Sequence, residues 1–206
     1  MIDTATQFLS LALFEDGNCV AHHHEQIDRG HAERLLPAIA ALPDGGRAER
    51  IAVDVGPGSF TGVRIGLAAA RALAFAWGAD LAGYSALSLI AAAVRDAHKS
   101  ADTFPVAITG GHGELFWQMF SSTSRGATTE LKSTPITMLA ELLDDNIIYG
   151  TGAQALVDAR NSGTAMNIYP DARLFPLLFQ ADASLPAKPL YGREADAKPM
   201  TAGAPS

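Results

Sequence analysis

An α/β fold is predicted by three features of the sequence. Residues 51–55 form a short apolar run that leads through a glycine-rich turn into a long alanine-rich segment, which is the order strand, turn, helix. Residues 8–14 and 19–24 are extended patterns on either side of the turn signal Asp16-Gly17, and they predict a hairpin. Residues 81–84 form a further strand pattern that precedes a second alanine-rich helix. Alternating strands and helices indicate a layered α/β architecture.

Composition and charge narrow the class of protein. The chain has 206 residues, 48% of them apolar and 18% charged, which are values of a globular protein long enough to bury a core. The formal net charge of −7 argues against direct nucleic-acid binding through a broad basic face. Cys19 is the single cysteine, which excludes an internal disulfide and fits a reducing compartment. No signal peptide or membrane segment is recognised, so we expect a cytoplasmic protein with no membrane partner.

The boundaries of further elements follow from capping and breaking residues. Ser59 or Thr61 is expected to cap a helix that runs to about Trp77 and stops at Gly78, and Ser85 is expected to cap another that ends near His98. Other predicted elements are a helix at 31–42 bent at Pro37, a hairpin formed by 105–108 and 114–120, a strand at 147–149, a short helix at 172–179 and an irregular tail from 185. A change of composition after Lys99 predicts two subdomains, residues 1–100 and 101–206.

The glycine turn matches neither common nucleotide-binding motif. Gly56, Gly58 and Gly62 have one residue too many for a dinucleotide fingerprint, and the turn lacks the lysine that a P-loop requires. Backbone amides at a helix start can still bind an anion, so Gly56 and Gly58 stay weak candidates for phosphate binding. A structural strand-to-helix turn is the favoured interpretation.

The helix after this turn carries small residues at every fourth position. Gly62, Gly66, Ala70 and Ala74 form one row on its surface, where another backbone can approach closely. Gly66 in mid-helix costs about 1 kcal/mol relative to alanine, so a compensating contact is required. Two explanations stay open: packing against the protein's own sheet, and packing against the helix of a partner.

Three segments resemble the TsaB (YeaZ) family of bacterial proteins. They are IDTAT at the start, HAERLLPAI at 31–39 and the long central stretch GPGSFTGVRIGLAAARALA, while GTG at 150–152 and PLYGREADAKP at 189–199 fit later family segments. The family belongs to the system that makes threonylcarbamoyladenosine beside the tRNA anticodon. The resemblance implies an actin-like (ASKHA, ribonuclease H-like) α/β fold of two subdomains, the second reduced, around a cleft.

The resemblance also implies a role as a non-catalytic scaffold. Family members support a paralogue, TsaD, which carries out the transfer chemistry. They bind TsaD through a helix bundle, and an ATPase, TsaE, is a further partner. Homodimerisation in the absence of TsaD is a further alternative, tRNA is expected only through the complex, and nucleotide only where the partners meet. The expected interface residues are His31, Leu35, Ile39, Gly62, Val63, Arg64, Gly66, Leu67, Ala70, Arg71 and Ala74.

Catalysis is the main alternative to a scaffold. The paralogue carries a metal-binding His-x-x-x-His, but Ala86 and Ile90 stand at the two aligned positions, and neither can ligate a metal. Asp3, Thr4 and Thr6 lie where actin-like ATPases contact phosphate and its metal, whereas the simpler interpretation is that they satisfy turn amides. An independent ATPase or kinase and a metallopeptidase-like hydrolase therefore remain as alternatives, with no resident cofactor or metal expected.

The chain departs from the family pattern at two places. Only Met1 and Ile2 precede Asp-Thr-Ala-Thr, so the first strand is expected to be short, and a natural start and a misplaced start codon both remain open. Thr109-Gly110-Gly111 replaces the family's Asp-Ala-Arg, whose role therefore cannot be carried over. His22, His23 and His24 are expected to be solvated strand residues. His112 beside Glu114 is a weak candidate for an acid–base pair.

Overall fold

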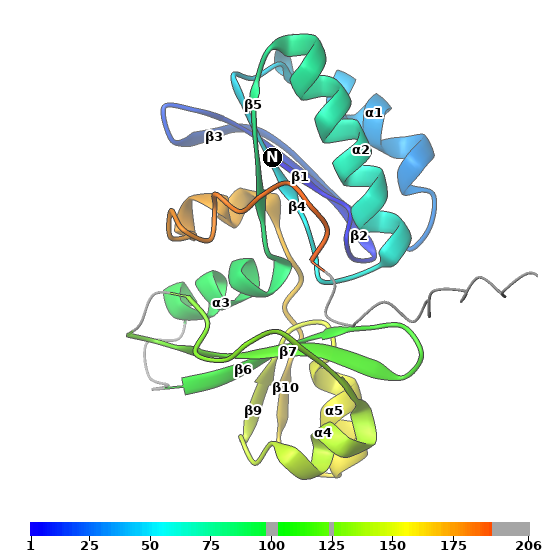
Figure 1. Cartoon of the computed structure of the whole chain (residues 1–206), viewed down its shortest axis with the longest axis vertical. Coiled ribbons are helices and arrows are strands. Elements are labelled where there is room, and N and C mark those ends of the chain that lie inside the picture. The colour runs from blue at the N-terminus through cyan, green and yellow to red at the C-terminus, as the bar shows by residue number, and fades with distance from the viewer. Residues whose placement is uncertain (98–102, 124–125, 191–206) are drawn as a thin grey trace, which may run out of the picture.

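Two five-stranded sheets form the two halves of the molecule (Figure 1). The structure is a computed structural model that describes residues 1–97, 103–123 and 126–190. The first sheet contains β1 (Ile2–Asp3), β2 (Phe8–Glu15), β3 (Asn18–Gln26), β4 (Arg50–Asp54) and β5 (Asp80–Tyr84), in the order β3-β2-β1-β4-β5. β2 and β3 are antiparallel, as the hairpin pattern predicts, and β1, β4 and β5 are parallel.

The second sheet lies beyond α3 (Ala86–Ala97) in the chain. It contains β6 (Thr103–Thr109), β7 (Glu114–Ser121), β8 (Lys132–Pro135), β9 (Ile147–Tyr149) and β10 (Thr164–Met166), in the order β10-β9-β6-β7-β8. Helices α4 (Ile136–Leu142) and α5 (Ala153–Arg160) accompany this sheet, and two short 3-10 helices are η1 (Pro43–Gly46) and η2 (Ala172–Leu177). The antiparallel β6–β7 hairpin confirms the prediction, while β8, α4, α5 and β10 were not predicted.

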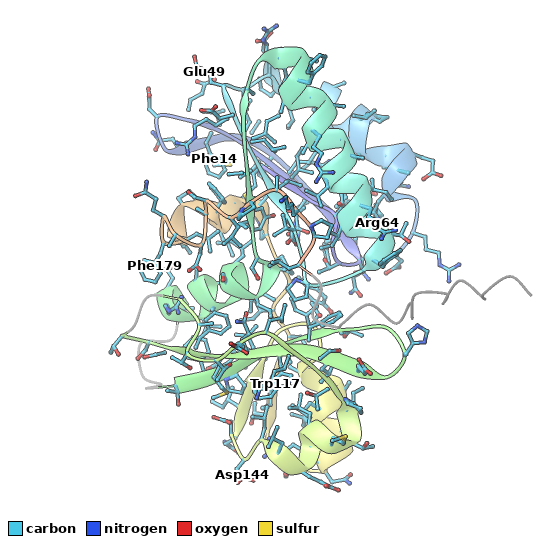
Figure 2. All side chains as sticks on the ribbon, in the orientation of Figure 1. Phe14, Glu49, Arg64, Trp117, Asp144 and Phe179 are labelled. Carbon is cyan, nitrogen blue, oxygen red and sulfur yellow. The ribbon has the colours of Figure 1, made fainter. Side chains whose placement is uncertain are left out.

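Helices α1 (His31–Ala40) and α2 (Phe60–Trp77) lie side by side over one face of the first sheet (Figure 1). The core between them is built from apolar side chains that are almost fully buried, including Leu9 and Leu11 of β2, Leu35 of α1 and Leu67 of α2. Figure 2 shows the side chains of both halves. The described residues contain no helix that is both long and apolar enough to traverse a bilayer.

The ends of α2 are those that its capping residues predict. The side chain of Ser59 accepts a hydrogen bond from the Gly62 amide at 3.2 Å, and Gly78 ends the helix with a φ of 68°, a conformation that favours glycine. The helix expected to end near His98 is described only to Ala97, because residues 98–102 lie outside the described part, as do residues 191–206.

The row of small residues on α2 faces the protein's own first strand. A Cβ at Gly62 would lie 2.0 Å from the Thr4 carbonyl oxygen, and a Cβ at Gly66 would lie 2.5 Å from Thr4 Oγ1. The Thr4 hydroxyl also donates to the Gly62 carbonyl at 2.7 Å. The compensating contact for a glycine in mid-helix is therefore internal, and packing against the own sheet is the correct explanation of this row.

The end of the described chain returns to the first sheet. η2 packs beside α3 and β2, Leu185 forms an antiparallel bridge to Gly83, and the Leu190 amide donates to the Val55 carbonyl at 2.8 Å. This return segment, residues 169–190, differs from the predicted division into residues 1–100 and 101–206, because its contacts tie the end of the second range to the first half.

Substitution at Gly66 tests the internal packing of α2. We expect Gly66→Leu to lower the free energy of unfolding by about 3 kcal/mol, since overpacking against Thr4 and Val53 exceeds the helix propensity that is gained. Chemical denaturation measures the change. The matched control, Ala68→Leu, places the same side chain on the exposed face of α2 and is expected to change stability by less than about 0.5 kcal/mol. Equal stability of both variants would contradict the packing.

Candidate functional site

Most of the predicted partner-interface residues are part of the protein's own core. His31, Leu35 and Ile39 of α1 are buried, and so are Gly62, Val63, Gly66, Leu67, Ala70 and Ala74 of α2. The prediction that these side chains contact a partner is therefore corrected: the helices are placed as expected, but this face of them is turned inward. Of the predicted set, Arg64 and Arg71 are exposed.

The outward face of α2 is lined by Arg64 and by residues outside the predicted set. Arg64, Ala68, Ala72 and Phe75 recur at helical spacing and are all exposed, and Phe75 is 92% exposed. On α1 the neighbouring Leu36 is 53% exposed. We call these five residues the outer face. The helical period predicts an exposed face of this kind, because positions two residues away from a buried row lie on the opposite side of the helix. The sequence alone does not say which row is buried.

The two arginines on α2 have partners within the chain. The Arg64 guanidinium lies 3.5 Å above the centre of the Phe60 ring, and the Arg71 guanidinium donates to the carbonyl of Ala187 at 2.7 Å. Arg71 therefore anchors the return segment against α2. Arg64 remains part of the outer face.

A hollow of about 1400 Å³ lies between the two halves of the molecule. Its walls are the β1–β2 turn, the start of α1, the start of α2 and the β6–β7 hairpin, with Gly58 and Thr109-Gly110-Gly111 among the lining residues. Asp3, Thr4 and Gly56 do not line it. A Cβ at Gly58 would lie 2.3 Å from the Ala5 carbonyl oxygen, so this glycine is required by internal packing.

Asp3, Asp54 and Tyr84 form a buried acidic cluster at the ends of β1, β4 and β5. Burial raises the pKa of Asp3 to about 6, against hydrogen bonds from Ala5 and Tyr84 that lower it. Burial, reinforced by the charge of Asp3, raises the pKa of Asp54 well above its usual value. Burial therefore favours the protonated forms of both carboxyls more than in an exposed carboxyl. Asp54 Oδ1 accepts from the Gly56 amide at 2.7 Å, as expected for a structural acceptor.

These residues do not fit the phosphate and metal that the actin-like resemblance implies. Asp3 Oδ1 accepts from the Ala5 amide at 3.2 Å, and Asp3 Oδ2 lies 3.1 Å from the Tyr84 hydroxyl. Thr4 is committed to Gly62, and Thr6 Oγ1 accepts from the Phe8 amide at 3.2 Å. A buried carboxyl whose two oxygens already accept internal hydrogen bonds is a poor magnesium ligand. The simpler interpretation, satisfied turn amides, describes these residues.

The described residues contain no cluster of three or more His, Cys, Asp or Glu side chains that could hold a metal. Ala86 and Ile90 lie buried in α3. Among the strand histidines, His24 Nδ1 lies 2.8 Å from Ser10 Oγ and His23 pairs with Glu25 at 3.2 Å, so these two rings have protein partners instead of being simply solvated. His112 lies exposed in the β6–β7 turn with a φ of 62°, and His31 lies 3.3 Å from the Phe8 carbonyl.

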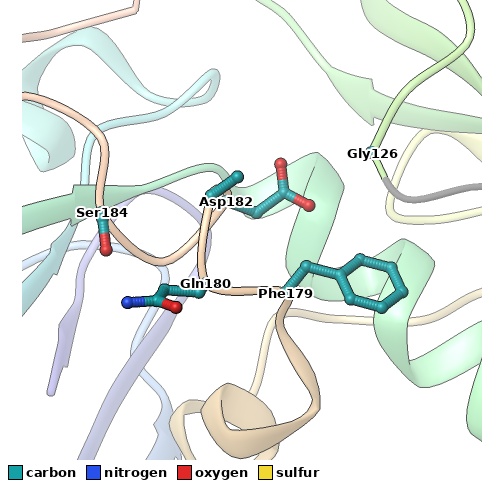
Figure 3. A pocket seen from close by; sticks show the side chains of 6 residues that line it. Gly126, Phe179, Gln180, Asp182 and Ser184 are labelled. Carbon is teal, nitrogen blue, oxygen red and sulfur yellow. The ribbon is translucent and has the colours of Figure 1, made fainter.

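A second hollow, of about 500 Å³, lies beside the return segment (Figure 3). Phe179 and Asp182 line it, and burial raises the pKa of Asp182 while Arg95 lowers it. Arg95 also lies 5.3 Å from the centre of the Phe179 ring. An aromatic ring and a carboxylate are a pair that binds cations, but the chain's own guanidinium already supplies the cation.

Comparison with known proteins gives consistent matches. The family described as "TsaD: tRNA N6-adenosine threonylcarbamoyltransferase" matches residues 21–162, more than half of the chain. The "tRNA threonylcarbamoyladenosine biosynthesis protein TsaB" of Escherichia coli K12 is 34% identical over 179 residues, which cover 80% of this chain and 76% of that protein. A tRNA N6-adenosine threonylcarbamoyltransferase of Anaeromyxobacter dehalogenans is 33% identical over 45% of this chain and 30% of its own.

A solved structure extends the likeness to the whole described fold. The crystal structure described as YeaZ from Pseudomonas aeruginosa superposes with a TM-score of 0.75 at 27% identity, and the match covers 92% of this chain and 97% of that one.

The acidic cluster predicts a specific dependence of stability on pH. Because the folded state raises both acid pKa values, it binds more protons than the unfolded chain above pH 4, so stability falls as pH rises through 6. We expect Asp54→Asn to flatten this fall and to exceed the wild type in stability at pH 8. The control Asp44→Asn alters an exposed residue and should follow the wild type. Urea unfolding from pH 4 to 8 measures both, and a parallel fall in all three proteins would contradict the buried pair.

Proposed function

The chain belongs to the TsaB family of tRNA threonylcarbamoyladenosine biosynthesis proteins, and from this premise we propose that it is a non-catalytic subunit that binds a TsaD-like paralogue. Its fold is the two-subdomain, actin-like fold of that family. In this proposal the paralogue performs threonylcarbamoyl transfer to the adenosine beside the anticodon, a TsaE-like ATPase acts in the same complex, and the work takes place in the cytoplasm.

The outer face of α1 and α2 is the observation that carries this proposal. Phe75 is a large apolar side chain, 92% exposed, on a helix face where Ala68 and Ala72 leave the backbone accessible. An aromatic side chain beside exposed alanines is suited to receive a partner helix, because small residues allow close approach and the aromatic supplies buried area. The partner's helix would pack here and not against the inward row of glycines.

Electrostatics and the acidic cluster support a scaffold over a catalyst. The formal net charge of −7 repels the tRNA backbone, so contact with tRNA falls to the partners. Asp3 and Thr4 are occupied by internal hydrogen bonds, which makes these two residues poor ligands for a nucleotide's metal. The contribution to the reaction is conformational: the chain binds the competent state of its paralogue more tightly than other states and so increases its population.

A charged substitution on the outer face tests the proposed interface. We expect Ala72→Arg to weaken binding to the TsaD-like partner at least tenfold, because the long side chain prevents close approach of the partner helix and its charge would be buried against that helix. The matched control is Ala159→Arg, an exposed alanine of α5. Calorimetric titration measures affinity, and thermal melting verifies that both variants fold. Normal binding by folded Ala72→Arg would place the interface elsewhere.

The independent ATPase is separated from the scaffold by a second measurement. We expect the purified chain alone to hydrolyse ATP no faster than Asp3→Ala, because the Asp3 carboxyl is buried and engaged by Ala5 and Tyr84. Phosphate release at saturating magnesium and ATP is the readout. Turnover that disappears in Asp3→Ala would favour the enzyme.

A further inference from the structure

The return segment is attached to the first sheet through one buried hydroxyl. Ser10 of β2 is 1% exposed and lies directly opposite His24 of β3. The backbone amide of Ala172, at the start of η2, donates to Ser10 Oγ at 2.9 Å. His24 Nδ1 lies 2.8 Å from the same oxygen. Ser10 therefore joins a strand of the first half to a segment that arrives from the second.

The protons of this arrangement can be assigned from its donors. A backbone amide only donates, so Ser10 Oγ accepts from Ala172 and retains one proton to give. When His24 Nδ1 carries no proton, it accepts this hydrogen bond from Ser10. In that form the ring is neutral and carries its own proton on Nε2.

The surroundings of His24 determine how it responds to acid. The Phe8 ring stacks on it at 4.6 Å, and Tyr169 of the return segment lies 4.8 Å from Phe8. Burial lowers the pKa of His24, and Asp171 raises it. Coulombic interactions with Arg173, His22 and His23 also lower this pKa. Arg173 donates to Asp171 through Nε at 3.0 Å.

We propose that His24, Ser10 and Ala172 form a proton-sensitive latch, which holds the return segment on the first sheet while His24 is neutral and loosens it when His24 is protonated. A protonated ring has a donor on both nitrogens, so the buried Ser10 hydroxyl loses its acceptor. The attraction of Asp171 for the imidazolium opposes this loss, because Asp171 belongs to the return segment. The lost acceptor is the change that weakens the contact that seats Ala172.

The latch has a consequence for the contact between the two halves. Phe175, three residues after Ala172, places its ring 5.7 Å from Tyr84 of the acidic cluster and 6.5 Å from Phe14 of β2. η2 also packs beside α3, which precedes the second sheet. Release of Ala172 weakens the ring contacts of Phe175 with Tyr84 and Phe14, and so loosens the contact between the two halves.

Hydrogen exchange of single amides by NMR tests the latch. After correction for intrinsic rates, we expect the protection of the Ala172 amide to be lower at pH 5.5 than at pH 7.5, by up to about fivefold where His24 is fully protonated, the effect of weakening one neutral hydrogen bond. In His24→Gln the side-chain oxygen still accepts from Ser10 and does not titrate, so protection should be equal at both pH values. His22→Gln, a histidine on the same strand that does not contact Ser10, should respond as the wild type does.

One internal reference and one further variant exclude other causes of a change in protection. The Leu11 amide of β2 should keep its protection at pH 5.5, which shows that the change is local and not global unfolding. Ser10→Ala should lower protection at Ala172 equally at both pH values. The latch is overturned by equal protection of wild-type Ala172 at both pH values, by a fall that persists in His24→Gln, or by a fall shared with Leu11.

Discussion

The close contact between Thr4 and α2 is the constraint on which the rest of the structure depends. Gly62 and Gly66 let the helix descend onto the end of β1, where the Thr4 hydroxyl bonds to the Gly62 carbonyl. This contact fixes the rotation of α2. Val63 and Leu67 then fill the core, and Ala68, Ala72 and Phe75 must face outward. The same contact engages the hydroxyl of Thr4, a residue that a phosphate site of this fold would need.

The molecule therefore has an actin-like architecture in which Asp3 and Thr4 are engaged by internal hydrogen bonds. Burial raises the pKa of Asp3 and of Asp54, the Tyr84 hydroxyl donates to Asp3, and the Phe175 ring of the return segment packs against Tyr84. Burial of uncompensated charge is costly, so it favours the protonated forms of these two acids. Exposed apolar side chains, among them Leu36 and Phe75, also lie on the α1–α2 face, where a partner is proposed to bind.

The first half of the fold could be predicted from the sequence because its signals are local. Ser59 and Gly78 mark the ends of α2, Asp16-Gly17 marks the β2–β3 turn, and strands β4 and β5 are compact apolar runs. The buried side of α2 could not be predicted, because Thr4, which determines it, lies 58 residues away from Gly62. Helices α4 and α5 are short and weakly periodic, and the return to the first sheet is a long-range contact without a local pattern.

Thiol labelling of the complex tests the central claim most directly. The Ala72→Cys substitution introduces a thiol in the outer face, and native Cys19, exposed on β3 beyond the β2–β3 turn, serves as an internal reference. The account predicts that the TsaD-like partner slows labelling of the introduced thiol at least about tenfold while Cys19 reacts at its free rate. A complex that forms while both thiols react at their free rates would contradict it.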